Sequence, residues 1–320
     1  MGAVGRVAAV VAVGLASVAV ARCGGSPAQQ QEMYDTKADA REQIAAAQAR
    51  AQRDHQRVLL MFGGNWCGWC LRLHGVLTGD EETARLLRDE YQLVMVDVGR
   101  FDRHMDIADR YGVELKKSGV PFLVVLDAEG QVLARQETGS LEKGKGHDVK
   151  KVRAFLRQWQ SERLEAEQVL AAGVARARVE EKRVLLRLGA LRCPWCRRLD
   201  EVLLRAEIAE VLGANYVEVL IDVDRMAGGK ELAERLRANP QGGIPWCAVL
   251  DGDGRVLGTS DGPEGNVGCP VTAGEIAHFV AMLSGTARRM RPEGLAAVRK
   301  ALEEHAREVR AEQAASKPGP

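Results

Sequence analysis

This sequence of 320 residues lacks an excess of either charge, a long apolar segment and a dense set of cysteines. Its 45 basic and 44 acidic residues nearly cancel, so neither a basic surface for nucleic acid nor an acidic tail is expected. The N-terminal apolar run, residues 7–21, is shorter than the roughly 20 residues that a membrane-spanning helix needs. Seven cysteines in a chain this long and this rich in core residues do not indicate a disulfide-stapled mini-protein. The length suffices for two globular domains.

The N-terminal segment has the pattern of an export signal. Arg6 precedes the apolar run 7–21, which has the length of the apolar region of a signal peptide. We therefore expect residues 1–22 to be a signal peptide and the protein to be exported to the bacterial periplasm or cell envelope. An uncleaved apolar N-terminus on a cytosolic protein is the alternative.

Two ways of processing this segment fit the residues that follow it. Ala19-Val20-Ala21 suits ordinary cleavage, whereas Val20-Ala21-Arg22-Cys23 loosely resembles a bacterial lipoprotein box, in which Cys23 would be lipidated and would tether the protein to a membrane. Arg22 fits that box poorly, because a small residue is expected before the cysteine, so ordinary export is favoured. Residues 23–36, rich in Gly, Ser, Pro and Gln, are expected to form a flexible tether in either case.

Two Cys-x-x-Cys pairs each follow a short apolar run. Residues 57–62 lead through two glycines to Cys67-Gly68-Trp69-Cys70, and residues 184–189 lead to Cys193-Pro194-Trp195-Cys196. The runs have the length of buried strands, and glycine allows a tight exit from each. If a helix begins at the first cysteine of a pair, its unpaired N–H groups and its dipole favour a thiolate there. This is the arrangement that a dithiol redox site needs.

The second half of the chain repeats the order of the first. The two pairs of cysteines are offset by 126 residues, and three further matches have nearly the same offset: Asp97 and Asp222 by 125, Pro121 and Pro245 by 124, and Asp127 and Asp251 by 124. A drift of two residues over a whole domain indicates an internal duplication. The expected helices are 37–57, 81–89, 149–160, 160–181, 275–283 and 287–313, and the expected strands are 57–62, 93–98, 118–126, 131–136, 184–189, 216–223, 246–250 and 255–258.

This order of elements, with Trp-Cys-x-x-Cys at a helix start, resembles the thioredoxin family over residues 37–160 and 165–285. The resemblance implies an α/β fold with two tandem thioredoxin-like domains, each a central mixed β-sheet flanked by helices. We expect these domains at residues 37–160 and 161–285, after an N-terminal signal segment and before a charged helix and tail at 286–320.

The chemistry expected of each pair is thiol–disulfide exchange on proteins. Exchange needs an exposed thiolate that attacks and an inner thiol that resolves the mixed disulfide. We assign Cys67 and Cys193 as the nucleophiles, and Cys70 and Cys196 as the resolving thiols. In such sites the pKa of the attacking thiol commonly falls from about 8.5 to between ~3.5 and 7.5.

Substrate-binding residues are also expected beside the pairs. Val120-Pro121 and Ile244-Pro245 correspond to the family's cis-proline, which lies against the dithiol and presents the preceding backbone to the substrate. Four of the five tryptophans lie within or near these motifs, although core packing alone would spread them more evenly. We therefore include Trp66, Trp69 and Trp195 among the substrate-binding residues.

No cofactor other than the redox-active disulfides, and no metal, is expected. In a zinc ribbon the second pair of cysteines follows the first after some 15–20 residues, whereas 122 residues lie between the two pairs of this chain. No histidine follows either pair, so c-type haem attachment is not indicated. The expected partners are protein thiol or disulfide substrates and an unidentified redox partner, without nucleic acid. A non-catalytic binding or chaperone module, or copper handling through the thiolate pairs, is the alternative.

The sequence departs from the family at several positions. Thioredoxins commonly carry a buried Asp six residues before the first cysteine, where this chain has Met61 and Arg187, so proton transfer to the inner thiol must use water or another group. The cluster Arg192, Arg197 and Arg198 predicts that the second site is the more oxidising one.

The direction of electron flow is left open by these residues. Cys247 and Cys269 could form a structural disulfide or supply a third redox thiol. A buried strand cysteine and a loop cysteine without a redox role are favoured.

Overall fold

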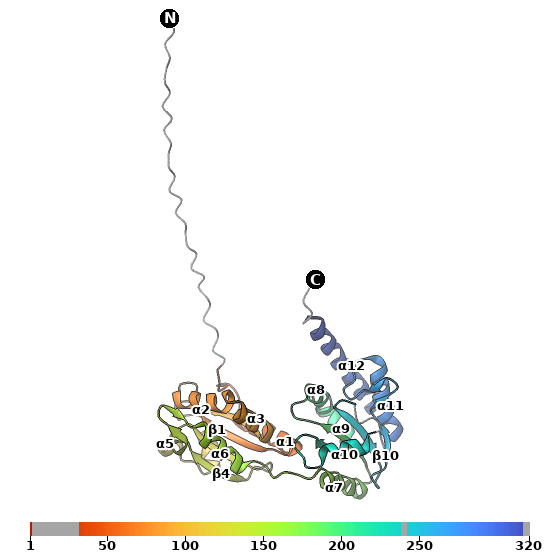
Figure 1. Ribbon diagram of the computed structural model, residues 1–320, viewed down its shortest axis with the longest axis horizontal. Coiled ribbons are helices and arrows are strands. Elements are labelled where there is room, and N and C mark those ends of the chain that lie inside the picture. Colours follow the sequence, from red (N-terminus) through yellow and green to blue (C-terminus); the bar gives the residue numbers. More distant parts are fainter. Residues whose placement is uncertain (2–31, 238–241, 316–320) are drawn as a thin grey trace.

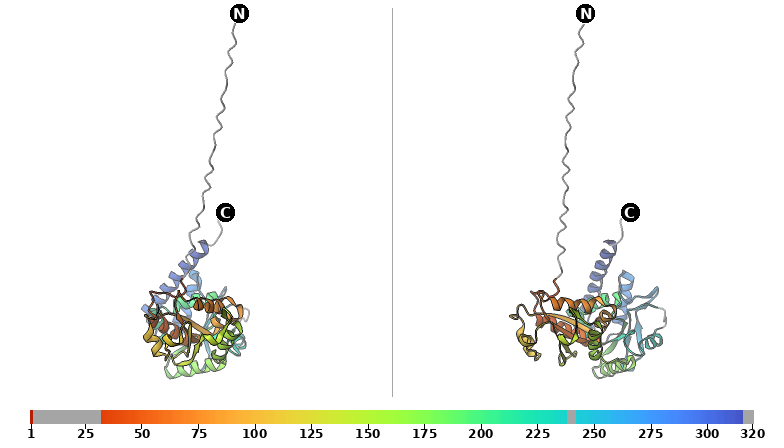
Figure 2. Two further views of the ribbon diagram at one scale, coloured as in Figure 1. Left: turned by 90° about the vertical axis from the view of Figure 1, so that its left-hand side faces the viewer. Right: turned by 60° about the vertical axis from the view of Figure 1, so that its left-hand side comes forward.

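The computed structural model describes Met1 and residues 32–237 and 242–315. The expected signal peptide, Cys23, most of the expected tether and the last five residues lie outside the described residues. Two α/β units lie side by side, the first built from residues up to 159 and the second from residues after 165 (Figures 1 and 2). Each unit has its own four-stranded sheet with helices packed on it, as the duplication predicts.

The first unit follows the expected order of elements. Its helices are α1 (Ala40–Asp54), α2 (Gly68–Gly79), α3 (Glu81–Glu90), α4 (Met105–Arg110), α5 (Leu115–Ser118) and α6 (Val149–Trp159). Its strands are β1 (Arg57–Gly63), β2 (Tyr91–Asp97), β3 (Phe122–Leu126), β4 (Val132–Glu137) and a short hairpin of β5 (Glu142–Lys143) and β6 (Gly146–His147).

The second unit repeats this order. Its helices are α7 (Ala166–Val179), α8 (Pro194–Leu203), α9 (Ala206–Asn215), α10 (Gly229–Leu236), α11 (Ala273–Thr286) and α12 (Pro292–Ala315). Its strands are β7 (Arg183–Gly189), β8 (Tyr216–Asp222), β9 (Trp246–Leu250), β10 (Val256–Thr259) and the hairpin of β11 (Asp261–Gly262) and β12 (Gly265–Asn266).

The two sheets have the same mixed topology. In the first the strand order is β2-β1-β3-β4, and in the second it is β8-β7-β9-β10. The strand before each Cys-x-x-Cys pair is parallel to one neighbour and antiparallel to the other. A parallel neighbour requires a crossover connection, and the helix that starts at the cysteine pair is part of it.

Strand β1 reads as a continuous apolar run because both of its faces are covered. Val58, Leu60 and Phe62 belong to the core cluster that includes residues of α1 and α4, whereas Leu59 and Met61 belong to the cluster on the other face, with α2 and α6. A strand buried on both faces loses the alternation of polar and apolar residues. The position of β1 inside the sheet places the first cysteine pair at the end of a strand that is buried over almost all of its length.

Two local expectations are corrected, and the expected C-terminal helix shows a feature that the sequence had left open. The connection between the units does not begin as a helix: residues 160–165 form no helix, and α7 begins at Ala166. The end of the expected tether is folded, because Tyr34 is fully buried in the first unit. One face of the charged helix α12 is also buried, since Val298, Leu302 and Ala306 join the core of the second unit. Among the described helices, none is long and apolar enough to cross a membrane.

Candidate active site

The first cysteine pair lies where β1 ends and α2 begins. Cys67 is the N-cap residue of α2, and its sulfur accepts a hydrogen bond from the backbone N–H of Cys70 at 3.1 Å. Cys67 and Cys70 form a disulfide with their Cα atoms 5.2 Å apart. The helix dipole and this N–H group both favour negative charge on Cys67 once the disulfide is reduced.

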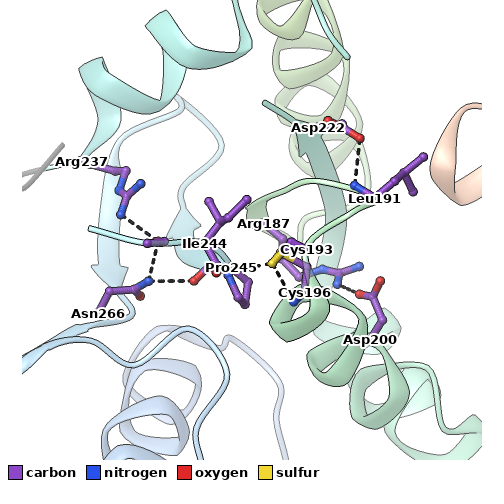
Figure 3. The surroundings of a disulfide bond; sticks show 11 residues. Arg187, Leu191, Cys193, Cys196, Asp200, Asp222, Arg237, Ile244, Pro245 and Asn266 are labelled. Atoms are coloured by element: carbon purple, nitrogen blue, oxygen red, sulfur yellow. Dashed lines mark hydrogen bonds and ion pairs between the residues drawn. A yellow bond between two sulfur atoms is a disulfide. The ribbon is translucent and has the colours of Figure 1, made fainter. Parts of the chain in front are cut away.

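The second pair repeats this geometry (Figure 3). Cys193 is the N-cap residue of α8, and its sulfur accepts a hydrogen bond from the Cys196 backbone N–H at 3.1 Å. Cys193 and Cys196 form a disulfide, again with Cα atoms 5.2 Å apart. Pro194 occupies the first turn of α8, where its missing N–H leaves no bond unmade.

A proline with a cis peptide bond lies against each disulfide. Both Val120-Pro121 and Ile244-Pro245 are cis. The carbonyl oxygen of Val120 lies 3.7 Å from Cys67 Sγ, and that of Ile244 lies 3.5 Å from Cys193 Sγ. The residue before each proline therefore presents its backbone beside the first cysteine of the pair.

Local hydrogen bonds hold these prolines in place. The Thr138 hydroxyl donates to the carbonyl oxygen of Pro121 at 2.7 Å in the first unit. In the second unit the Asn266 side-chain amide donates to the carbonyl oxygens of Pro245, at 2.8 Å, and Gly243, at 2.9 Å (Figure 3). The proline is thus held by the turn that precedes the β5–β6 hairpin in the first unit and by β12 in the second.

The two first cysteines differ in accessibility. Cys67 is only 5% exposed, whereas Cys193 is half-buried. The expectation of an exposed first cysteine fits the second site better than the first. Cys67 is packed in the same cluster as Trp69 and Val120, which limits its access to solvent. The inner cysteines are buried in both units, as expected, with Cys70 fully buried and Cys196 9% exposed.

The tryptophans of the pairs lie at the surface beside the cysteines. Trp66 and Trp195 are 42% and 39% exposed, and an arginine side chain lies over each ring. Trp69 is half-buried and meets His147 edge to face, with ring centroids 5.5 Å apart. Burial lowers the pKa of His147, and both of its ring nitrogens lack hydrogen-bond partners. Sequence reasoning missed His147, because only the fold brings it to Trp69.

Beneath each disulfide lies the residue that stands where thioredoxins have a carboxylate. Met61 pairs across the sheet with Leu123, and Arg187 pairs at the equivalent position with Cys247. Because side chains alternate along a strand, Arg187 points to the same face as Gly189, whose missing Cβ leaves room for Cys196 Sγ. Met61 belongs to the same core cluster as Cys70, whereas Arg187 lines a cavity together with Cys196 and is drawn beside that site in Figure 3.

Arg187 is 3% exposed and pairs with two carboxylates. It donates a hydrogen bond to Asp200 of α8 and another to Glu218 of β8, the latter at 3.5 Å. Burial alone would lower the pKa of Arg187, but the charges of Asp200 and Glu218 outweigh burial and raise the pKa. The guanidinium group therefore stays charged within the second unit.

The arginines on the surface of the second site are partly neutralised. Arg192 lies 3.7 Å from a carboxylate oxygen of Asp89, and Arg198 lies 2.6 Å from one of Glu312. Carboxylates at these distances offset the field that the arginines exert on Cys193. Arg187 is likewise paired with Asp200 and Glu218, so among the arginines on which the prediction of a more oxidising second site is based, Arg197 carries most of it.

Cys247 and Cys269 are free thiols. Cys247 is fully buried in β9, and burial raises its pKa to about 12. Burial also raises the pKa of Cys269 to about 12. A protonated thiol is a poor nucleophile, so neither cysteine is poised for exchange. The reading of a buried strand cysteine and a loop cysteine matches this arrangement, and no disulfide joins them.

A cavity of about 260 Å³ separates the two units next to the second site. Cys196, Asp200 and Pro245 line it from the second unit, and Arg53, Asp54 and His55 line it from the first. Arg225 of the second unit joins the two units by donating hydrogen bonds to the carbonyl oxygens of Asp54 and His55 in the first, at 2.9 and 3.2 Å.

The two disulfides do not face each other. The second site lies against the end of the first unit where α1 stops, near the start of β1, whereas Cys67 follows the other end of β1. Seven residues of strand span roughly 20 Å. Direct transfer of a disulfide from one pair to the other is therefore incompatible with this arrangement. Within the described residues, no cluster of three or more His, Cys, Asp or Glu side chains could hold a metal ion.

Comparison with known proteins agrees with this geometry. Residues 39–128 match a family model described as thioredoxin-like, and residues 145–258 match the model Thioredox_DsbH, described as a protein of unknown function, DUF255. A curated relative, the disulfide bond reductase DsbH of Chlamydia pneumoniae, is 30% identical over 99 residues, which are 29% of this chain. This chain spans 60% of the length of that relative.

Two solved structures are matched by this chain over most of their length. The disulphide isomerase of Xylella fastidiosa Temecula1 is 31% identical, with 39% of this chain and 95% of that chain covered and a TM-score of 0.36. A thioredoxin of Thermus thermophilus is 23% identical, with 35% of this chain and 80% of that chain covered and a TM-score of 0.28. Each cysteine pair lies in a segment that matches a thioredoxin-like family model, on the same strand–helix arrangement, so both halves of the chain are similar to thioredoxin-like proteins.

Proposed function

We propose that this protein is a thiol–disulfide oxidoreductase that acts on protein disulfides or dithiols through its two Cys-x-x-Cys sites. The observation that supports this most is the repeated geometry of the sites. In each, the first cysteine caps a helix and accepts an N–H bond, and a carbonyl before a cis-proline lies within 3.7 Å of its sulfur. The names of the relatives, a disulfide bond reductase and a disulphide isomerase, point to the same chemistry.

In the reducing direction, each site passes two electrons to a substrate disulfide. The thiolate of Cys67 or Cys193 attacks one substrate sulfur, and the other substrate sulfur leaves as a thiolate and takes up a proton. The inner thiol, Cys70 or Cys196, then loses its proton and attacks the first cysteine. The second substrate thiol leaves, and the enzyme disulfide forms. Oxidation of a substrate dithiol is the same sequence in reverse.

Substrate binding is assigned to the surface around each first cysteine. The carbonyl groups of Val120 and Ile244, before Pro121 and Pro245, are positioned to accept hydrogen bonds from an extended peptide. Trp66 and Trp69 border the first site, and Trp195 borders the second. Aromatic rings supply contact area at low cost in side-chain entropy, which suits unfolded or varied protein substrates.

We also infer the organisation of the whole chain. The first domain is assigned to residues 37–160 and the second to 161–285, with the packed helix α12 attached to the second. Residues 1–22 are proposed to direct export to the bacterial periplasm or cell envelope, where a separate redox partner recycles the two sites. The mass of the mature N-terminus distinguishes cleavage after Ala21 from lipidation at Cys23, and an intact Met1 in exported material would contradict both.

Reduction of insulin by dithiothreitol tests the proposed activity. The protein should accelerate insulin precipitation, and Cys67→Ser and Cys193→Ser should each remove the contribution of one site. The double variant should fall to the rate without protein. Cys247→Ser is the matched control, because it changes a cysteine outside both pairs and should retain the wild-type rate. An unchanged rate in the double variant would overturn the enzymatic proposal and favour a binding module.

A further inference from the structure

The hydroxyl group of Tyr34 lies beneath the first disulfide without a hydrogen-bond partner. Tyr34 is fully buried, and its side chain belongs to the same core cluster as Cys67 and Cys70. Its hydroxyl oxygen is one of the buried side-chain atoms that make no hydrogen bond. Buried tyrosine hydroxyls usually have a partner, and one without a partner costs free energy. This unused donor therefore calls for an explanation.

The position of Gly63 shows that the hydroxyl and the inner sulfur are neighbours. A Cβ atom on Gly63 would lie 2.2 Å from the Tyr34 hydroxyl oxygen and 2.6 Å from Cys70 Sγ. Glycine at the end of β1 thus leaves open a small space that both atoms border. No side chain of residue 63 stands between the hydroxyl and the sulfur.

Hydrogen bonds to the active-site loop hold Tyr34 in this position. The backbone N–H of Tyr34 donates to Asn65 Oδ1 at 2.9 Å, and Asn65 Nδ2 donates to the carbonyl oxygen of Tyr34 at 2.9 Å. Asn65 lies between β1 and Cys67, so the two bonds join the N-terminal segment directly to the loop that carries the first cysteine. Tyr34 is thereby placed by the site itself and not by general packing alone.

Among the described residues, no hydroxyl takes the equivalent position in the second site. Gly189 occupies the position of Gly63, and a Cβ there would meet Cys196 Sγ at 3.3 Å and Leu220 Cδ1 at 3.8 Å. An apolar carbon takes the place of the phenol oxygen. The two sites thus differ in the group that borders the space beside the inner sulfur.

We propose that Tyr34 is a positioning residue for the first site, and that its hydroxyl donates a hydrogen bond to the sulfur of Cys70 when the disulfide is reduced. A disulfide sulfur is a weak acceptor, which explains why the hydroxyl is unpartnered in the oxidised protein. A thiolate is charged, and hydrogen bonds to charged acceptors are the strong ones. The inference rests on the proposed exchange activity. The hydroxyl would stabilise the Cys70 thiolate but would not take up its proton, so proton transfer still uses water or the substrate.

The proton balance of the resolving step is consistent with this role. Cys70 gives its proton to water or to the departing substrate thiolate, and its own thiolate then attacks Cys67 Sγ and releases the substrate. Tyr34 keeps its proton throughout and contributes only the hydrogen bond. Burial, followed by the nearby charge of Asp97, raises the pKa of Tyr34, so the hydroxyl remains a donor.

The reduction potential of the first site tests this proposal. In a Cys193→Ser, Cys196→Ser background, only the first pair exchanges with a glutathione redox buffer. In buffers alkaline enough to ionise Cys70 in the reduced protein, loss of the bond to its thiolate should make Tyr34→Phe roughly ten-fold harder to reduce, which corresponds to a potential about 30 mV more negative. Tyr111→Phe is the matched control, because Tyr111 lies in the core on the opposite face of the sheet and should leave the potential unchanged.

A potential that is unchanged in Tyr34→Phe would overturn the proposal. If that variant does not fold, 3-fluorotyrosine at position 34 provides the test, since its phenol is a stronger hydrogen-bond donor of nearly the same shape. It should shift the potential in the opposite direction, and no shift would again refute the role. These equilibria need no protein substrate, so a wild-type protein inactive on insulin would refute the proposed function while the role of Tyr34 is still measured.

Discussion

Replacement of Arg187 by methionine would give the second site the side chain that the first site has at Met61. Arg187 has a side chain that is 4% exposed, and its partners Asp200 and Glu218 are 19% and 28% exposed. The variant removes a buried cation and leaves two carboxylates that face each other across the space it filled. The second unit should therefore lose stability while the first does not.

The expected loss follows from the burial of these groups. Removing one partner of a buried ion pair costs about 3–5 kcal/mol. Asp200 and Glu218 retain some contact with solvent and can take up water, so a value near the lower end, about 3 kcal/mol, is expected. Changing all three residues, in Arg187→Met with Asp200→Asn and Glu218→Gln, should recover much of this loss because no buried charge is left without a partner.

Hydrogen exchange in urea, measured by mass spectrometry, separates the two units. Protection of β7 and β8 should fall in Arg187→Met, and β1 and β2 serve as the control within the same molecule. Met61→Leu, which conserves volume in the first unit, should change neither unit by more than about 1.5 kcal/mol. A loss below about 1 kcal/mol in Arg187→Met, the value typical of a surface pair, would refute the reasoning.

Two further predictions concern titratable groups outside the disulfides. Burial lowers the pKa of His305 on α12 below 6.5, so the unfolded state binds the proton more readily, and stability should fall as the pH drops below 6.5. In His305→Leu the melting temperature should fall less when the pH is lowered. An unchanged dependence of melting temperature on pH would contradict the role given to His305. Because burial raises the pKa of Cys247 to about 12, iodoacetamide at neutral pH should label reduced Cys193 long before Cys247. Peptide mass spectrometry measures both rates, and equal labelling in the native protein would show that Cys247 is not held protonated.

Local patterns in the sequence were sufficient for most of the fold. The apolar run of β1 and the two glycines after it predicted a strand and a tight exit, and the structure has both. Asp148 and Thr272 are of residue types typical of helix N-caps, and both accept backbone hydrogen bonds at the starts of α6 and α11. Such features depend on residues a few positions apart, so a single sequence encodes them directly.

The offset between the halves carried the prediction further than either motif alone. It matched each cysteine pair with a proline about 50 residues further along the chain, and both prolines are cis and lie against the cysteines. Tryptophan clustering was less reliable. Trp246 lies near a motif, but it is fully buried and its indole N–H bonds Asp261, so it is a core residue.

The sequence by itself determined the two sites, because a cysteine pair at a helix start and a proline before a strand are local features. Only the tertiary structure decided what lies beneath each site and which way it faces. Tyr34 lies in a stretch with the composition of a linker, and its hydrogen bond with Asn65 holds it beside the first site. Arg187 donates a hydrogen bond to Glu218 on the neighbouring strand. These contacts join segments about 30 residues apart, and the periodicity of apolar residues carries no information about such pairings. The orientation of the units likewise depends on single contacts such as that of Arg225 with Asp54.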